Sequence, residues 1–152
     1  MAQSLLSVAP LRILSVEDTD EDFYLLQLVL NDCSTSFELN RIADGAEAVR
    51  FLGHLGESPH EDWPDLILLD LNLPQVNGLG ILEFIKSHAA LCDIPVVIFT
   101  SSSDVREKDK ALALRADEFV TKPVSLDEMS AVVSQLCSKY LPQDREAAGG
   151  AG

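Results

Sequence analysis

Short apolar runs alternate with amphipathic stretches along most of this chain. Five runs have the length of β-strands, and they cover residues 11–16, 37–42, 66–69, 96–99 and 118–121. The third and fourth are continuously apolar, which is typical of parallel strands buried on both faces. The second alternates apolar and polar side chains, so we expect it nearer an edge of the sheet.

Five amphipathic stretches follow these runs, and each gathers its apolar side chains on one helical face. They cover residues 22–32, 45–55, 79–87, 105–115 and 126–140. Each interval between runs is long enough for a helical crossover between parallel strands. The pattern predicts a doubly wound α/β domain with a five-stranded parallel sheet and five flanking helices.

The length of 152 residues suits a single domain. We expect this domain to cover residues 11–142. The segments 1–10 and 143–152 are expected to be disordered tails, because they lack the apolar periodicity of the rest.

Composition excludes several classes of function. The chain has 11 Lys and Arg against 25 Asp and Glu, a net charge of −14, which disfavours binding to nucleic acid or to an anionic membrane. No apolar run reaches the ~18 residues of a membrane span, and no signal peptide is evident at the N-terminus. The three cysteines are widely spaced and odd in number, as expected for free thiols in a reducing compartment. We therefore expect a cytoplasmic protein.

Polar side chains stand where the apolar runs end. Glu17 and Asp18 follow the first run and Asp70 follows the third, while Thr100 and Lys122 follow the fourth and fifth. The carboxyl ends of parallel strands share one edge of a sheet. With the strand order 2-1-3-4-5, the first and third strands are neighbours at the switch point, where ligands bind. We expect these side chains to share one pocket.

Three carboxylates in one pocket repel one another unless a cation compensates them. A site of few carboxylates, with positions open to water, suits Mg²⁺ together with a phosphoryl oxygen. Asp70 is then a candidate nucleophile that forms an acyl phosphate. Thr100 and Lys122 are candidates to neutralise the phosphoryl oxygens.

Each of these residues alone also has a structural interpretation. An Asp after a strand commonly caps a turn, and a Lys-Pro pair commonly marks one. Acids in the first turn of a helix interact favourably with its dipole, and we assign Asp20, Glu21 and Asp22 to that role. The order and spacing of the whole set favour the functional interpretation.

With these residues the chain resembles the receiver domains of bacterial two-component response regulators, of the chemotaxis-regulator type. The resemblance covers about residues 11–140. It rests on Val16-Glu17-Asp18, the segments 66–74 and 94–101, Asn77-Gly78 and Thr121-Lys122-Pro123. Segment 64–74 and the long loop before it look more narrowly like the single-domain regulators that serve bacterial phytochromes. The resemblance implies a flavodoxin-like fold.

The resemblance also implies a metal site and a phosphoacceptor. Asp70 is the residue expected to accept the phosphoryl group. Asp18 is expected to bind Mg²⁺ directly and Glu17 through water. The backbone carbonyl of Asn72 completes the expected set of protein ligands.

The resemblance further implies a switch. Thr100 is expected to bind the phosphoryl group and to shift on activation, together with Phe119 at the aromatic switch position. Lys122 is expected to pair with a phosphoryl oxygen, and a cis Lys122–Pro123 peptide bond to orient it. The family usually has glycine where Arg115 stands, so we expect the preceding helix to end differently.

These features predict a single-domain response regulator in a phosphorelay. A sensor histidine kinase, with a bacteriophytochrome as one candidate, would donate the phosphoryl group. The output would pass to an effector protein or a homodimer. The chain would act only on itself, through phosphoryl transfer and autodephosphorylation.

Two alternatives come from other classes. A small phosphatase of the haloacid dehalogenase type also uses an aspartyl nucleophile, but after its first strand and with a second Asp where Asn72 stands here. A degenerate receiver that serves only as a binding module would have lost Mg²⁺ binding.

Overall fold

The computed structural model describes residues 9–140 as five parallel strands in one sheet with helices on both faces. The strand order is β2-β1-β3-β4-β5, so the predicted doubly wound fold and its order are confirmed. The strands are β1 (Leu11–Val16), β2 (Phe37–Ile42), β3 (Leu66–Leu69), β4 (Val96–Thr100) and β5 (Glu118–Thr121). The helices are α2 (Asp20–Asn31), α3 (Gly45–Leu55), α4 (Gly78–Ser87), α5 (Val105–Ala113) and α6 (Leu126–Lys139), with a short 3₁₀ turn η1 (His60–Asp62).

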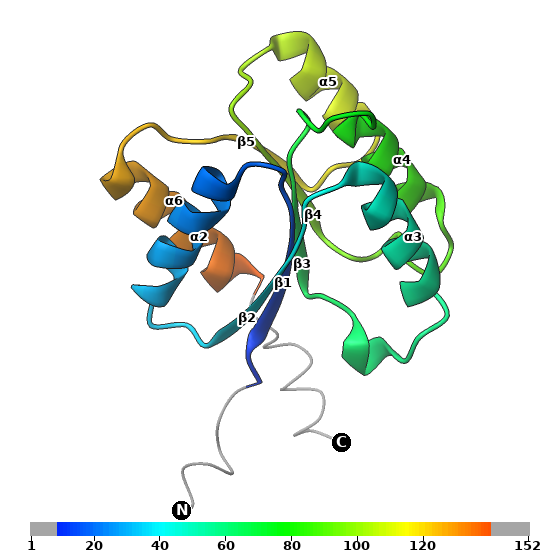
Figure 1. The fold of residues 1–152 in the computed structure, drawn as a ribbon, viewed down its shortest axis with the longest axis horizontal. Coiled ribbons are helices and arrows are strands. Elements are labelled where there is room, and N and C mark those ends of the chain that lie inside the picture. Colours follow the sequence, from blue (N-terminus) through cyan, green and yellow to red (C-terminus); the bar gives the residue numbers. More distant parts are fainter. Residues whose placement is uncertain (1–8, 141–152) are drawn as a thin grey trace, which may run out of the picture.

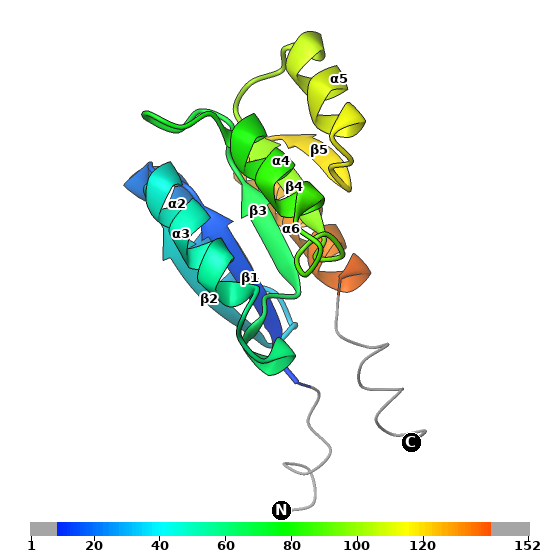
Figure 2. The ribbon, with the colours of Figure 1, turned by 90° about the vertical axis from the view of Figure 1, so that its right-hand side faces the viewer.

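Two layers of helices enclose the sheet (Figures 1 and 2). Helices α2 and α6 cover one face, and α3, α4 and α5 lie on the other side. Strand β3 shows why its sequence is continuously apolar: Leu66 and Leu68 join the core beneath α2 and α6, whereas Ile67 and Leu69 join the core beneath α3 and α4. All four side chains are buried. A strand with a core on each face needs an apolar side chain at every position.

The ends of several elements differ from the predicted ones by one or two residues. Helix α2 begins at Asp20 rather than at residue 22, and the three acids that follow Thr19 form its first turn. Strand β4 extends to Thr100, which pairs with Thr121 of β5. Within the described residues, no helix is long and apolar enough to cross a membrane. The predicted tails at 1–10 and 143–152, and the predicted domain end at 142, lie mostly outside the described residues and stay predictions.

Helix α5 ends in the backbone conformation that favours glycine, although no glycine is present. Arg115 has a φ of 73°, and the amide of Ala116 donates to the carbonyl of Ala111 at 3.0 Å. The prediction that this helix ends differently is therefore wrong for the backbone, because Arg115 adopts the left-handed conformation itself. The side chain compensates in part, since its Nη2 donates to the carbonyl of Lys86 at 2.6 Å.

This geometry predicts a difference between two substitutions at position 115. Both Arg115→Ala and Arg115→Gly lose the bond to Lys86, but only glycine relieves the left-handed backbone of its Cβ. We expect Arg115→Gly to be the more stable variant by about 1 kcal/mol. Urea unfolding of the two variants measures this difference, and equal midpoints would contradict it.

The described cysteines are free thiols, as the sequence predicts. Cys137 is 1% exposed in the core between the sheet and α6. Burial, with a smaller effect of the neighbouring Cys33 thiol, raises the pKa of Cys137 to about 11. A buried thiol with so high a pKa is a poor nucleophile.

We therefore expect slow alkylation of Cys137 in the folded protein. A pKa of about 11, against the ordinary value of 9.0, leaves roughly a hundredfold less thiolate near pH 8. Iodoacetamide labelling followed by peptide mass spectrometry should find Cys92 modified well before Cys137. Equal rates in the native protein, rather than only after unfolding in urea, would refute this.

Candidate phosphoacceptor and metal site

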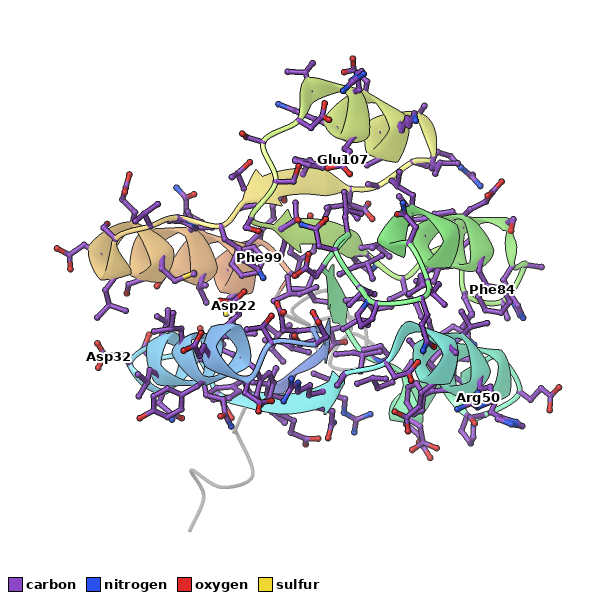
Figure 3. The ribbon with its side chains drawn as sticks, turned by 45° about the horizontal axis from the view of Figure 1, so that its top comes forward. Asp22, Asp32, Arg50, Phe84, Phe99 and Glu107 are labelled. Atoms are coloured by element: carbon purple, nitrogen blue, oxygen red, sulfur yellow. The ribbon has the colours of Figure 1, made fainter. Side chains whose placement is uncertain are left out.

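The carboxyl ends of the strands bring the predicted residues to one edge of the sheet, which faces the viewer in Figure 3. Strands β1 and β3 are neighbours, with Val16 opposite Leu69, so the residues that follow them lie side by side. Carboxylate oxygens of Glu17, Asp18 and Asp70 all lie within 4.8 Å of one another. The predicted acidic pocket is confirmed as a feature of the fold.

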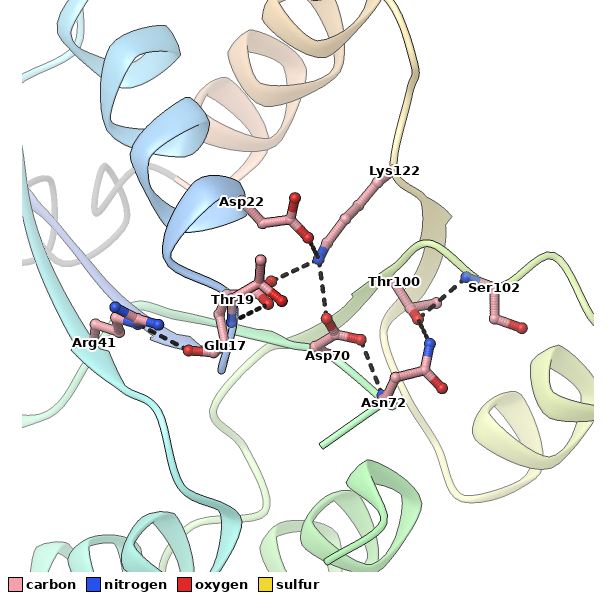
Figure 4. A network of polar contacts seen from close by, with 9 residues as sticks. All are labelled: Glu17, Thr19, Asp22, Arg41, Asp70, Asn72, Thr100, Ser102 and Lys122. Atoms are coloured by element: carbon pink, nitrogen blue, oxygen red, sulfur yellow. Dashed lines mark hydrogen bonds and ion pairs between the residues drawn. The ribbon is translucent and has the colours of Figure 1, made fainter. Parts of the chain in front are cut away.

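Lys122 crosses the pocket from the end of β5 and binds three carboxylates (Figure 4). Its Nζ lies 2.6 Å from Glu17 Oε1, 2.9 Å from Asp70 Oδ2 and 2.8 Å from Asp22 Oδ2. An ammonium group has three hydrogens, so each of them has one carboxylate acceptor. The side chains of Lys122, Glu17 and Asp70 are each less than 10% exposed.

Burial and pairing oppose each other in this cluster. Burial disfavours the ammonium form of Lys122, but the bonds from Asp22, Glu17 and Asp70 outweigh it and raise its pKa well above the usual value. For Glu17, burial is the largest effect and exceeds the attraction of Lys122, so its pKa is raised. The pocket thus holds a permanent cation and a carboxylate whose charge is only partly compensated.

Asp70 and Thr100 are held by further contacts. Asp70 Oδ1 accepts a hydrogen bond from the backbone amide of Asn72 at 3.0 Å, so both oxygens of Asp70 are bound. The Thr100 side chain is fully buried. Its Oγ1 lies 3.4 Å from Asn72 Nδ2 and 3.3 Å from the amide of Ser102. Both contacts are long, so little holds this hydroxyl in its present direction.

Glycine at position 78 allows the chain to pass closely behind Asp70. A Cβ at Gly78 would lie 2.7 Å from the Cα of Leu71 and closer still to the carbonyl oxygen of Asp70. The amide of Gly78 donates to the carbonyl of Leu71 at 3.2 Å. The start of α4 therefore supports the loop that carries Asp70 and Asn72.

Two residues with contacts at the site were not predicted from the sequence. Asp22 was assigned to the helix dipole alone, but it also binds Lys122. Arg41 of β2 donates through Nε to the carbonyl of Glu17 at 2.8 Å and through Nη1 to Asp20 at 2.7 Å. The signal for Arg41 was its place near the end of the strand that pairs with β1.

The predicted cis peptide bond is wrong. The residues that the structure describes contain no cis peptide, so the Lys122–Pro123 bond is trans. The trans form is favoured by about 0.5–1 kcal/mol even before proline, and Lys122 reaches its three carboxylates with it. Phe119 is half-buried and packs against the core beneath α3 and α4, and its switch role stays a prediction.

Comparison with known proteins identifies the class of this domain. The profile of the response regulator receiver domain matches residues 13–134, so the chain belongs to the receiver domain family. The nucleophile of the phosphatase alternative would follow the first strand, whereas Asp70 follows β3.

Among its relatives are response regulators, one of which is described as a phytochrome response regulator. The chain is 36% identical to the response regulator Rcp1 of Synechocystis sp. over 132 residues, which cover 87% of this chain and 90% of Rcp1. The phosphorylated cyanobacterial phytochrome response regulator RcpA has a similar structure, with a TM-score of 0.79, 33% identity and coverage of 89% and 96%. A Mn²⁺-bound structure of Rcp1 matches with a TM-score of 0.76, 36% identity and coverage of 87% and 95%.

The acidic pocket predicts stabilisation by a divalent cation. The Asp18 carboxylate makes none of the ion pairs found within residues 9–140 and is partly exposed, so it can accept a cation without displacing Lys122. At a hundredfold excess over its dissociation constant, a cation bound only to the folded state adds about 2.7 kcal/mol. We expect Mg²⁺ or Mn²⁺ to raise the unfolding temperature.

Asp18→Asn should abolish most of this rise, because one of the three clustered carboxylates is lost. The matched control is Glu21→Gln, which removes an exposed carboxylate three residues further along and should leave the rise unchanged. Thermal scans with and without the cation compare the variants. The same rise in Asp18→Asn as in the unmodified chain would speak against this site.

Proposed function

We propose that this receiver domain is a phosphorylation switch in a two-component phosphorelay, with Asp70 as the phosphoacceptor. The observation that carries the proposal is the position of Asp70. Its carboxylate lies at the switch point of the sheet, within 4.8 Å of Glu17 and Asp18 oxygens and 2.9 Å from the Lys122 ammonium. Fixed cations beside a carboxylate nucleophile are what phosphoryl transfer requires.

The metal in this proposal is Mg²⁺. The donors fit it, because they are few, all oxygen and negatively charged. Asp18 and Asp70 would bind it directly, Glu17 through water, and the backbone carbonyl of Asn72 would complete the protein ligands. Bound there, Mg²⁺ supplies positive charge for the phosphoryl oxygens and for the crowded carboxylates.

The transfer step follows from the placement of the side chains. An oxygen of Asp70 attacks the phosphorus of a phosphohistidine; an O–P bond forms, and the N–P bond to the histidine breaks. Lys122 stays protonated and pairs with a phosphoryl oxygen, while the Thr100 hydroxyl turns from Asn72 to donate to another. Attack by water on the acyl phosphate later returns Asp70 and free phosphate, so the chain acts only on itself.

The switch in this proposal runs from β4 to the outer surface. Movement of Thr100 leaves space that Phe119, on the neighbouring strand, can fill. Such a change repacks the surface formed by α5, β5 and α6. That surface would then bind an effector protein or a second copy of the chain.

The partner that donates the phosphoryl group is proposed to be a sensor histidine kinase, and a bacteriophytochrome is the favoured candidate. The support is the likeness to RcpA, which is described as a cyanobacterial phytochrome response regulator. The free thiols and the excess of acids suit a cytoplasmic protein that does not bind nucleic acid.

Intact mass spectrometry tests the proposal directly. Incubation with Mg²⁺ and a small phosphodonor such as acetyl phosphate should add one phosphoryl group to the protein. Asp70→Asn should add none, and removal of the metal with EDTA should prevent the gain. An equal gain in Asp70→Asn, or none in the unmodified chain, would refute the proposal.

A further inference from the structure

Lys122 is held from the solvent side by a carboxylate that belongs to a helix. Glu17 and Asp70 follow strands and have side chains only 6% exposed, whereas Asp22 lies in the first turn of α2 and is 36% exposed. Figure 4 shows Asp22 and Asp70 on opposite sides of the Lys122 amine. The ammonium is therefore held between the phosphoacceptor and Asp22.

The contact with Lys122 distinguishes Asp22 from the other acids in its turn. Asp20, Glu21 and Asp22 all lie in the first turn of α2, where negative charge stabilises a helix. Asp20 is paired with Arg41, and Glu21 is exposed. Only Asp22 among the three reaches Lys122. Asp22 therefore binds the cation of the pocket, a contact that the stability of the helix does not require.

A phosphoryl group on Asp70 needs the same ammonium. Its oxygens extend from Asp70 toward Lys122 and carry about two negative charges. The ammonium already has one carboxylate for each of its three hydrogens. Two anions bound to one ammonium lie within about two hydrogen-bond lengths of each other, and charges at that distance repel in a partly buried site. Asp22 therefore competes with the phosphoryl group.

We propose that Asp22 is a positioning residue that restrains Lys122 and lowers the affinity of the site for the phosphoryl group. This inference rests on the proposed function, because it assumes that Asp70 accepts phosphate. Asp22 shifts the equilibrium between the unphosphorylated and the phosphorylated form of the domain. Asp22 occupies one hydrogen of the Lys122 ammonium, so the unphosphorylated form is favoured until a strong donor acts.

The test measures binding of beryllofluoride, a phosphoryl mimic, in the presence of Mg²⁺. Asp22→Asn keeps an oxygen acceptor but loses the charge, and we expect half-saturation, followed by ¹⁹F NMR, at a roughly tenfold lower concentration. The fraction phosphorylated at steady state with acetyl phosphate should rise in parallel. Asp22→Glu, which restores the charge, should return both values toward those of the unmodified chain.

The matched control is Glu21→Gln, which removes a carboxylate from the same helical turn and should change neither value. A second measurement reports on Lys122 itself, in protein without metal or phosphodonor. The ammonium ¹H–¹⁵N signal of Lys122 should be protected from solvent exchange in the unmodified chain and in Glu21→Gln. In Asp22→Asn it should exchange faster, whereas a general effect of charge would leave it unchanged.

The outcomes separate this inference from the proposed function. If the unmodified chain takes up a phosphoryl group on Asp70 but Asp22→Asn binds beryllofluoride no more tightly, the role of Asp22 is wrong and the proposed function stands. A similar gain in Glu21→Gln would also overturn it, because the effect would then be one of net charge. If Asp70→Asn still takes up phosphate, the proposed function itself fails.

Discussion

The ammonium group of Lys122 compensates the charge of an otherwise repulsive pocket. It binds Glu17, Asp22 and Asp70 at 2.6–2.9 Å. Glu17 follows β1, Asp22 lies in α2 and Asp70 follows β3, while Lys122 itself follows β5. Two of the carboxylates are almost fully buried. A buried carboxylate is strongly unfavourable without a partner. One side chain therefore compensates acids that three separate parts of the chain bring together.

The rest of the fold sets the positions of these charges. Strands β1 and β3 are neighbours because the order of the sheet reverses between them, which brings Glu17 beside Asp70. Both faces of β3 are covered by apolar cores, so the strand that carries Asp70 has little freedom to shift. Gly78 lets α4 start close behind the loop. The pocket is thus rigid at Asp70 and less constrained at Thr100, whose contacts are long.

Most of the fold was predictable because its signals are local. Continuous apolar runs such as 66–69 are typical of strands buried on both faces. The polar residues directly after each run mark the edge of the sheet where the strands end. Contacts between distant elements were harder to predict. Asp22 fits the dipole of its own helix so well that its sequence context gives no sign of Lys122, which lies 100 residues away. The left-handed backbone at Arg115 was not predicted, because a sequence pattern favours glycine for that conformation. The trans bond before Pro123 is the intrinsically favoured form, and the cis form was expected only from the family resemblance.

The long separation of Lys122 from its partners also has a consequence for synthesis of the protein. Lys122 follows Glu17 by 105 residues and Asp70 by 52. While the chain leaves the ribosome, the first three strands emerge with their acids before β5 and its lysine are available. Until β5 docks, Glu17 and Asp70 lack the ammonium group that binds them in the finished sheet. A chain that ends before Lys122 therefore lacks the ammonium that binds Glu17 and Asp70, so this pocket is completed only together with the sheet.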